Sequence, residues 1–335
     1  MAINKQFKLA ARPAGMVKRS DFLYAETPAA APQDGEVQVQ TLYLSLDPAM
    51  RGWMNEGKSY IPPVGIGEVM RAGGLGKVLE SKGPAFRPGD IVNGMLGVQT
   101  LGTFKAKELR KVDPTLAPLP KYLGVLGMPG MTAYFGLLDV GLPKEGETVV
   151  VSGAAGAVGQ IVGQIARIKG CRAVGIAGGQ DKCDFVVKEL GFDACVDYKS
   201  GDLREGLKRA CPKGVDVYFD NVGGDILDTV LTRLNMKARI VICGAISQYN
   251  NSTPVKGPSN YMSLLVNRAR MEGMVVFDYI KRYGEAVREM AQWMKDGKLH
   301  SREHLVPGFE KFPETLLMLF TGENFGKLIL DVTKD

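Results

Sequence analysis

TVVVSGAAGAVG, residues 148–159, joins a run of apolar, mostly β-branched residues to a glycine-rich turn. An uninterrupted apolar run of this kind is typical of a parallel strand that is buried on both faces. The turn is a variant of the dinucleotide loop G-x-G-x-x-G, with Ala154 where the first of these glycines would stand. Gly156 would let the backbone approach a pyrophosphate, and Gly159 would let the next helix pack against the sheet. The stretch therefore predicts a dinucleotide-binding domain.

The segments around this motif alternate between strand and helix patterns. Helical spacing over residues 158–168 precedes a second apolar strand at 172–177, and residues 182–190 are again helix-like. Strand-like runs at 216–220 and 239–243 continue the pattern. Such alternation predicts a doubly wound parallel sheet in an α/β fold.

The first part of the chain has a different character. It is rich in Gly and Pro and carries short apolar runs, such as residues 36–44, 76–79 and 91–92. These features predict a mainly β domain, a small barrel or sandwich. Residues 306–335 return to this character. We therefore expect a domain of residues 1–125 that is completed by 300–335, and a nucleotide-binding domain of residues 126–299.

Composition narrows the class of protein. The 335 residues include 42 basic and 36 acidic side chains, spread without a basic block, so the net charge of +6 does not by itself indicate nucleic-acid binding. No apolar run resembles a signal peptide or a membrane span, and we expect a cytoplasmic protein. Five cysteines without a C-x-x-C pair predict free thiols in a reducing compartment: Cys171, Cys183, Cys195, Cys211 and Cys243.

The choice of nicotinamide cofactor depends on the end of the second strand. An NAD enzyme usually carries an acidic residue there, on the adenosine ribose. Here the strand ends in Gly178, Gly179 and Gln180, and Lys182 follows. Small residues plus a cation suit the 2′-phosphate of NADPH, although Asp181 would repel it if it pointed inward. The alternative is that Lys182 is a solvated helix residue.

The sequence also argues against catalytic zinc. Zinc needs Cys, His or acidic ligands, yet the first 170 residues contain neither Cys nor His. The histidines, His300 and His304, lie near the C-terminus and would share a face only if that segment were helical. We therefore expect no metal. Without a Lewis acid, hydroxyl groups and the cofactor must polarise a carbonyl, which favours reduction of a conjugated alkene over alcohol oxidation.

Several motifs together resemble one family. The chain is similar to the medium-chain dehydrogenase/reductase superfamily, and within it to the zinc-free branch of prostaglandin reductases, plant alkenal double-bond reductases and bacterial curcumin reductases. The matching stretches are LSLDPAMRGWM (44–54), GMPGMTAYFGLL (127–138), AAGAVG (154–159), FDNVGG (219–224), CGAISQY (243–249) and GENFGK (322–327). SYIPP (59–63) and GPSNY (257–261) look most like the curcumin-reductase group.

The resemblance implies a fold and a set of cofactor contacts. The fold is a GroES-like β-rich N-terminal domain followed by a Rossmann domain that binds NADPH. Lys182 and Tyr198 would meet the adenosine 2′-phosphate. The other contacts would come from the pyrophosphate loop, the nicotinamide half and the returning terminal segment: Gly156, Ala157, Val158, Gly159, Asn221, Cys243, Gly244, Ala245, Ile246, Ser247, Tyr249, Met274, Val275, Val276 and Asn324.

Two departures from the family pattern affect catalysis. Relatives commonly carry tyrosines where this chain has Ala49 and Val266. The nearest remaining hydroxyls are those of Tyr60 and Tyr261, with Tyr249 behind them. We expect Tyr261 and Tyr60 to donate a hydrogen bond to a forming enolate oxygen, because tyrosine is protonated near neutral pH. The alternative for each is a packing role.

The expected function is NADPH-dependent reduction of the C=C bond of α,β-unsaturated aldehydes and ketones, in a homodimer that pairs through the strand after Met271. Hydride would reach the β-carbon of a small-molecule substrate, and a proton the α-carbon. Two alternatives remain. One is an NADPH:quinone reductase, which shares the fold and the lack of zinc. The other is a non-enzymatic NADPH-binding protein, although no aromatic and basic stripe supports RNA binding.

Overall fold

The structure, a computed structural model, describes residues 2–334 and divides into two compact units. The first unit comprises the chain up to Leu123, together with Glu303–Asn324 and the residues from Leu328 onward. The second comprises Gly124–Arg302 and the short piece Phe325–Lys327. Residues 300–302 and Phe325–Lys327 thus belong to the second unit, whereas the sequence led us to expect all of residues 300–335 in the first.

The first unit is rich in antiparallel strands. One sheet has the order β14-β15-β3-β4-β5-β7, with β6 paired to β3 beside this path, and β1 pairs with β2. β15 lies antiparallel to β3, so the terminal segment completes this sheet. The strands are β1 (Ile3–Leu9), β2 (Phe22–Pro28), β3 (Glu36–Ser45), β4 (Gly74–Ser81), β5 (Ile91–Gly94), β6 (Leu101–Lys105), β7 (Arg110–Val112), β14 (Glu303–Pro307) and β15 (Lys327–Asp331).

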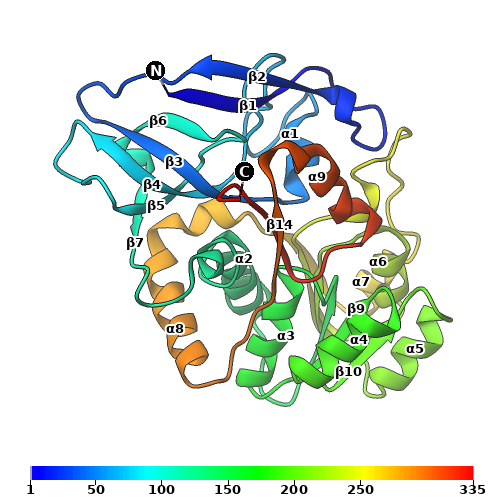
Figure 1. The fold of residues 1–335 in the computed structure, drawn as a ribbon. Coiled ribbons are helices and arrows are strands. Elements are labelled where there is room, and N and C mark those ends of the chain that lie inside the picture. Colours follow the sequence, from blue (N-terminus) through cyan, green and yellow to red (C-terminus); the bar gives the residue numbers. More distant parts are fainter. Residues whose placement is uncertain (1, 335) are drawn as a thin grey trace. The chain divides into compact units, whose positions relative to one another are not determined.

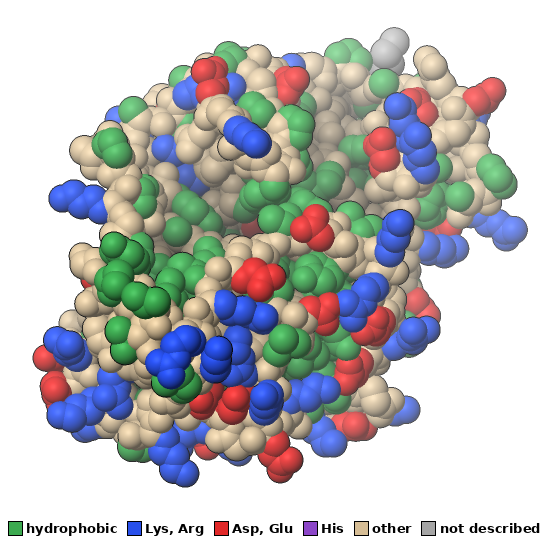
Figure 2. Space-filling view, turned by 180° about the vertical axis from the view of Figure 1, so that it is seen from behind, with side chains coloured by type: hydrophobic (Ala, Val, Ile, Leu, Met, Phe, Trp, Pro, Cys, Tyr) green, Lys and Arg blue, Asp and Glu red, His purple; other side chains and the backbone are tan. Residues whose placement is uncertain are grey.

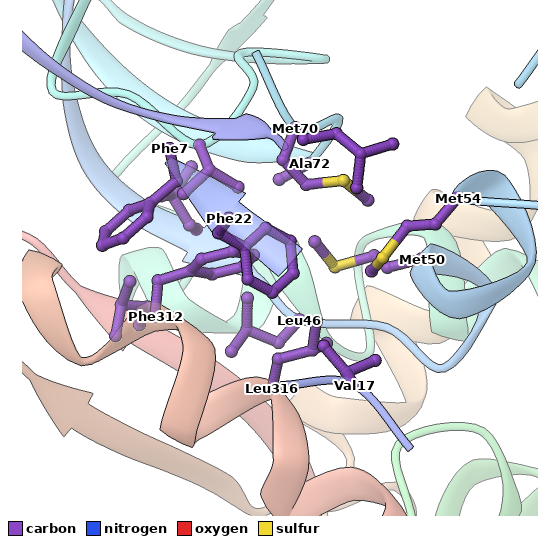
Figure 3. Close-up of a cluster of buried hydrophobic side chains, with 14 of the residues drawn as sticks. Phe7, Val17, Phe22, Leu46, Met50, Met54, Met70, Ala72, Phe312 and Leu316 are labelled. Atoms are coloured by element: carbon purple, nitrogen blue, oxygen red, sulfur yellow. The ribbon is translucent and has the colours of Figure 1, made fainter. Parts of the chain in front are cut away.

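A core of aromatic and methionine side chains holds the first unit together. Figure 3 shows Phe7, Phe22 and Phe312 around one centre, and the Phe22 and Phe312 rings are 5.0 Å apart, edge to face. Met50 and Met54 close the other side. The core thus joins β1 and β2 to α1 (Ala49–Trp53), α9 (Phe312–Thr321) and the 3₁₀ turn η8 (Phe309–Lys311). The unit also contains the 3₁₀ turns η1 (Arg19–Asp21), η2 (Ala106–Glu108) and η3 (Leu119–Leu123).

The second unit contains a parallel sheet with the order β10-β9-β8-β11-β12-β13. β8 is fully buried, as its apolar sequence requires. The chain runs outward from β8 to β9 and β10 and then crosses to β11, so the order reverses between β8 and β11. The strands are β8 (Thr148–Ser152), β9 (Arg172–Ala177), β10 (Ala194–Asp197), β11 (Val215–Asp220), β12 (Leu234–Ile242) and β13 (Arg270–Gly273).

Helices cover this sheet and bury its apolar side chains. Helix α3 packs on β8 and β9, and it lies beside α2, which in turn contacts α8 (Figure 1). Helices α5 and α6 share a second buried cluster with the strands. The helical segments are α2 (Met128–Phe135), α3 (Gly159–Ile168), α4 (Gln180–Asp184), α5 (Leu203–Ala210), α6 (Gly224–Leu231), α7 (Met262–Val266), α8 (Tyr283–Lys295), the π turns η4 (Gly136–Gly141) and η5 (Phe185–Glu189), and the 3₁₀ turns η6 (Ile246–Gln248) and η7 (Val276–Arg282).

The predicted α/β class and parallel sheet are confirmed, with three changes in detail. The helix predicted over residues 182–190 begins at Gln180 and becomes a π turn from Phe185. Cys243 follows β12 and does not belong to it. The apolar run 274–277, which we expected in the edge strand, also follows its strand, because β13 ends at Gly273 and a 3₁₀ turn begins at Val276.

The cysteines are unpaired, and the surface charges are of both signs (Figure 2). All five cysteines are free thiols. Within the described part of the chain, none of the helices combines the length and the apolar character of a membrane span. Figure 2 shows Lys and Arg side chains interspersed with Asp and Glu on the face that it presents.

Candidate functional site

The loop after β8 forms a tight turn that brings the first turn of α3 close to the strand. A Cβ atom on Gly159 would lie 2.2 Å from the Gly153 carbonyl oxygen, so only glycine fits there. The Gly156 amide donates to the same oxygen at 2.9 Å. Among residues 2–334, no acceptor takes the amide hydrogens at the head of α3, those of Ala157, Val158 and Gly159. A helix N-terminus with free N–H groups suits a phosphate anion.

The returning terminal segment lies against this loop. Gly326 donates its amide hydrogen to the Ala155 carbonyl at 2.9 Å, and Gly156 and Gly326 form a parallel bridge. These contacts lie within the second unit, and they fix the backbone of the loop from the side. Asn324, two residues earlier, belongs to the first unit.

The ends of β9 and β10 form one cluster at one side of the loop. A Cβ atom on Gly178 would lie 2.8 Å from the Tyr198 hydroxyl and 3.0 Å from Cε of Lys199, so glycine lets both side chains lie across the end of β9. Asp197 shapes this cluster, because its Oδ1 accepts hydrogen bonds from the Gly179 and Lys199 amides at 2.8 and 2.9 Å. Although burial opposes it, these bonds hold the pKa of Asp197 below its usual value.

Two lysines give this cluster a positive charge. Burial, and secondly the charge of Lys199, lowers the pKa of Lys182. Its Nζ lies 5.6 Å from the centre of the Phe325 ring, a cation–π contact. Asp181 is exposed. Sequence reasoning missed Lys199; the signal was a basic residue directly after Tyr198, at the end of the strand beside β9.

At the other side of the loop, hydrogen bonds connect the ends of β8 and β11 to the turn after β12. Asn221 donates its backbone N–H to Ser152 Oγ at 2.9 Å and its side-chain amide to the Ser152 carbonyl at 2.8 Å. Ile246 donates to the Asn221 carbonyl, and the Ser247 amide and hydroxyl both donate to the Val222 carbonyl. The predicted nicotinamide residues of these segments therefore lie together.

The turn after β12 is packed against its own tyrosine. The Ala245 amide donates to the Tyr249 hydroxyl at 3.1 Å, and a Cβ atom on Gly244 would lie 2.8 Å from that oxygen. Burial, and secondly the charge of Asp220, raises the pKa of Cys243 to about 12. The Cys243 thiol is therefore protonated at neutral pH, which lowers its nucleophilicity.

The residues after β13 continue the same edge. Met274 donates its amide hydrogen to the Ile242 carbonyl at 3.1 Å, which extends the pairing beyond the strand. Met274 and Val276 are buried, and Val275 is half-buried. A Cβ atom on Gly136 would lie 3.6 Å from Cγ of Met274, so these side chains also pack against the π turn η4.

The two candidate tyrosines are both exposed and belong to different units. Tyr261 is 59% exposed and directly precedes α7; Asn260 beside it is anchored by Asp228, whose Oδ1 accepts its amide hydrogen at 2.7 Å. Tyr60 is 54% exposed, and its hydroxyl accepts a hydrogen bond from Trp53 Nε1 at 3.2 Å.

The structure thus brings the predicted cofactor residues of the second unit to the carboxyl edge of one sheet, leaving Tyr60 and Asn324 in the first unit. Within residues 2–334, no group of three or more His, Cys, Asp or Glu side chains could hold a metal. His300 lies in a loop and His304 in β14, so they do not share a helical face.

Comparison with known proteins gives matches along the whole chain. Residues 5–112 match a family described as the N-terminal domain of oxidoreductases, and 157–295 one described as zinc-binding dehydrogenase. The chain is 45% identical to the NADPH-dependent curcumin reductase of Escherichia coli over 99% of its own length and 98% of that protein. It is 44% identical to the NADP-dependent 2-alkenal reductase of Nicotiana tabacum, over 90% and 88%.

A solved structure agrees with this result. CurA of Vibrio vulnificus, crystallised with NADPH, superposes with a TM-score of 0.93 at 45% identity and covers 99% of this chain and 100% of its own. These sequence identities of 44–45% are high enough to indicate a common family and not only a common fold. The chain therefore belongs to the medium-chain dehydrogenase/reductase superfamily, in the zinc-free branch of NADP-dependent oxidoreductases that includes the curcumin, 2-alkenal and prostaglandin reductases.

Proposed function

We propose that the chain uses NADPH to reduce the C=C bond of α,β-unsaturated aldehydes and ketones. The observation that carries this proposal is the end-to-end similarity, at 44–45% identity, to proteins named for curcumin and 2-alkenal reduction. The reaction adds hydride to the β-carbon and a proton to the α-carbon. The residues at the carboxyl edge of the second unit's sheet suit this chemistry.

The residues present fit NADPH. The bare N–H groups at the head of α3 suit its pyrophosphate, and Gly159 leaves no room for a side chain there. Lys182 and Lys199 supply charge for the 2′-phosphate, and the Tyr198 hydroxyl supplies a donor. The nicotinamide would meet Asn221, the turn from Cys243 to Tyr249, and residues 274–276, with Asn324 closing the site. When bound, the cofactor supplies the hydride.

The chain itself must hold the substrate oxygen and supply the proton. Charge develops on the carbonyl oxygen as the β-carbon takes the hydride, and a neutral hydroxyl donor lowers the energy of that state. Tyr261 and Tyr60 are the candidate donors, because both are exposed. The Tyr60 oxygen accepts a hydrogen bond from Trp53 Nε1 at 3.2 Å, which holds the hydroxyl in place. Cys243 is protonated, so covalent addition of its thiol to the enone is disfavoured.

The test is an NADPH-oxidation assay with the purified protein over four substrate groups: enals, simple enones, aryl enones and quinones. We expect turnover of at least one enal or enone class, with the saturated carbonyl compound as the product by mass spectrometry. Deuteride from 4-deuterated NADPH should appear at the β-carbon. Turnover of quinones alone would instead favour the quinone-reductase alternative, and binding of NADPH without any turnover would favour a non-enzymatic role.

We also propose a homodimer that pairs through β13. This strand is at the edge of the sheet, with β12 as its one neighbour within residues 2–334, and its residues are mostly exposed. An exposed edge strand can extend its hydrogen-bonding to a second copy. Light scattering should return twice the chain mass of 36.2 kDa at micromolar concentration. A particle of one chain mass would contradict this arrangement.

A further inference from the structure

Asp220, the last residue of β11, holds a carboxylate in the interior of the second unit. Its side chain is 1% exposed. Its Oδ1 is the acceptor of four hydrogen bonds, from the Tyr218 hydroxyl at 2.8 Å, the Ser152 hydroxyl at 3.0 Å, and the Gly223 and Val222 amides at 2.9 and 3.0 Å. Four donors therefore converge on one oxygen of a carboxylate that is almost entirely removed from solvent.

Among residues 2–334, Asp220 forms no ion pair with a Lys, Arg or His side chain, and its buried Oδ2 accepts no hydrogen bond. The charge acts on its surroundings: after burial, it is the next cause that raises the pKa of Tyr218 and of Cys243. A buried charge without a partner is costly, and such groups concentrate at functional sites.

The topology places Asp220 at the nicotinamide half of the site. Ser152 and Asp220 are the last residues of β8 and β11, the two strands between which the order of the sheet reverses. Dinucleotides bind across that point, at the carboxyl ends of the strands. The 2′-phosphate cluster lies at the ends of β9 and β10, on one side of it. Asp220 lies on the other side, and its carbonyl accepts the amides of Cys243 and Gly244.

We propose that Asp220 acts through its charge to favour the cationic, oxidised nicotinamide ring of NADP⁺ over the neutral ring of NADPH, and so promotes hydride release. In the reaction the ring loses a hydride and becomes a pyridinium cation. The electron pair of that hydride forms the new C–H bond at the β-carbon, and the carbonyl oxygen holds the negative charge until the α-carbon is protonated. A nearby fixed anion stabilises the positive charge as it develops.

This inference rests on the proposed cofactor site, and its test separates the two. Dissociation constants for NADP⁺ and for NADPH are measured by calorimetry on wild type and on Asp220→Asn, which keeps the size and the accepting oxygen. We expect the ratio Kd(NADP⁺)/Kd(NADPH) to rise on the order of tenfold in the variant. Tyr218→Phe removes one hydrogen bond but no charge, and should leave the ratio unchanged.

A second pair of variants keeps the test decisive if Asp220→Asn does not fold. Val222, two residues from Asp220, is half-buried. Val222→Lys adds a positive charge beside the carboxylate and should raise the ratio, whereas Val222→Met should not. A ratio that stays constant while NADPH still binds would overturn the role of Asp220 and leave the proposed function intact. Failure of wild type to bind either nucleotide would overturn both.

Discussion

The two ends of the candidate cofactor site differ in the charge and the exposure of their groups. At the ends of β9 and β10, two lysines and an exposed tyrosine lie around Gly178. At the ends of β8, β11 and β12, the groups are backbone amides, Asn221, a protonated thiol and the buried carboxylate of Asp220. The first end suits a phosphate that is recognised and does not react. The second suits a ring whose charge changes.

This difference shows how one sheet edge separates selectivity from chemistry. Long lysine side chains can discriminate between NADPH and NADH without disturbing the reacting atoms. The reacting end instead uses short groups tied to the backbone, such as Asn221 on Ser152. Groups that are already fixed need no rearrangement as charge develops. Changes at one end should therefore alter cofactor choice, and changes at the other should alter turnover.

The largest effect is expected on cofactor preference, when the two lysines at the ends of β9 and β10 are removed; we call this part of the site the positive end. A charge-assisted hydrogen bond contributes about 1.5–3 kcal/mol. The double change Lys182→Ala and Lys199→Ala should therefore lower the preference for NADPH over NADH by on the order of 100-fold or more. Steady-state kcat/KM for each cofactor measures this preference. Each single change should give a smaller loss.

Lys188→Ala is the matched control. Lys188 lies in the helical segment that follows Lys182, but its ammonium pairs with Asp184 at 2.8 Å on the surface. Its loss should leave the preference unchanged. A control that reduced the preference as much as the double change would mean that the net charge of the surface, and not a defined phosphate site, selects NADPH.

A comparable loss, but in kcat alone, is expected when a tyrosine hydroxyl that donates to the substrate oxygen is removed. Removing one preorganised donor typically costs on the order of 100-fold in kcat. Tyr261→Phe should show this loss on an enone with unchanged Kd for NADPH, and Tyr60→Phe should show a smaller one. Tyr249→Phe is a useful comparison, because its hydroxyl accepts from Ala245 and its loss should perturb the turn. If both single variants and the double variant keep wild-type kcat, the tyrosine-donor model is wrong.

The sequence predicted the parts of this site that depend on local pattern. β8 and β9 were predicted with their observed bounds, because a fully buried strand needs an unbroken apolar run. Gly159 was predicted for its close packing, and the structure shows why. Asn221 and the turn from Cys243 were assigned to the site only through the family resemblance. They lie side by side because β11 pairs with β12, a contact that no local sequence pattern reveals.

Other features could not be predicted because they depend on tertiary contacts. Lys199 lies beside Gly178 only because β10 pairs with β9 in one register. Asp220 looks in the sequence like the end of an ordinary strand, since nothing local reveals that it is buried with four donors on one oxygen. Phe325 packs on Phe185 of the second unit, with ring centres 5.5 Å apart, although the segment before it, Glu303–Asn324, belongs to the first.

A smaller effect is expected from pH, which should change the affinity for NADPH through Lys182. Burial and Lys199 lower the pKa of Lys182 in the free protein. Lys182 therefore loses its charge at a lower pH than an ordinary lysine, and NADPH affinity should fall several-fold as the pH rises toward about 10. NADH affinity should change little. Lys199→Met removes one cause of the lowered pKa, so the fall should move to higher pH. Titrations of both cofactors between about pH 7 and 10 measure this, and superimposable curves for wild type and variant would contradict it.

The smallest expected effect is that of metal removal, which tests whether the reacting end works with hydroxyl groups alone. Zinc polarises a carbonyl through Cys, His or carboxylate ligands, and the first 170 residues offer neither Cys nor His. Within residues 2–334, no three His, Cys, Asp or Glu side chains are grouped so that they could hold a metal, and His300 and His304 do not lie on one helix. Exhaustive chelation should leave kcat on an enone unchanged, and elemental analysis of the active protein should find no stoichiometric zinc. If chelation removed zinc and activity together, and added zinc restored the activity, a metal and not a tyrosine would polarise the substrate carbonyl.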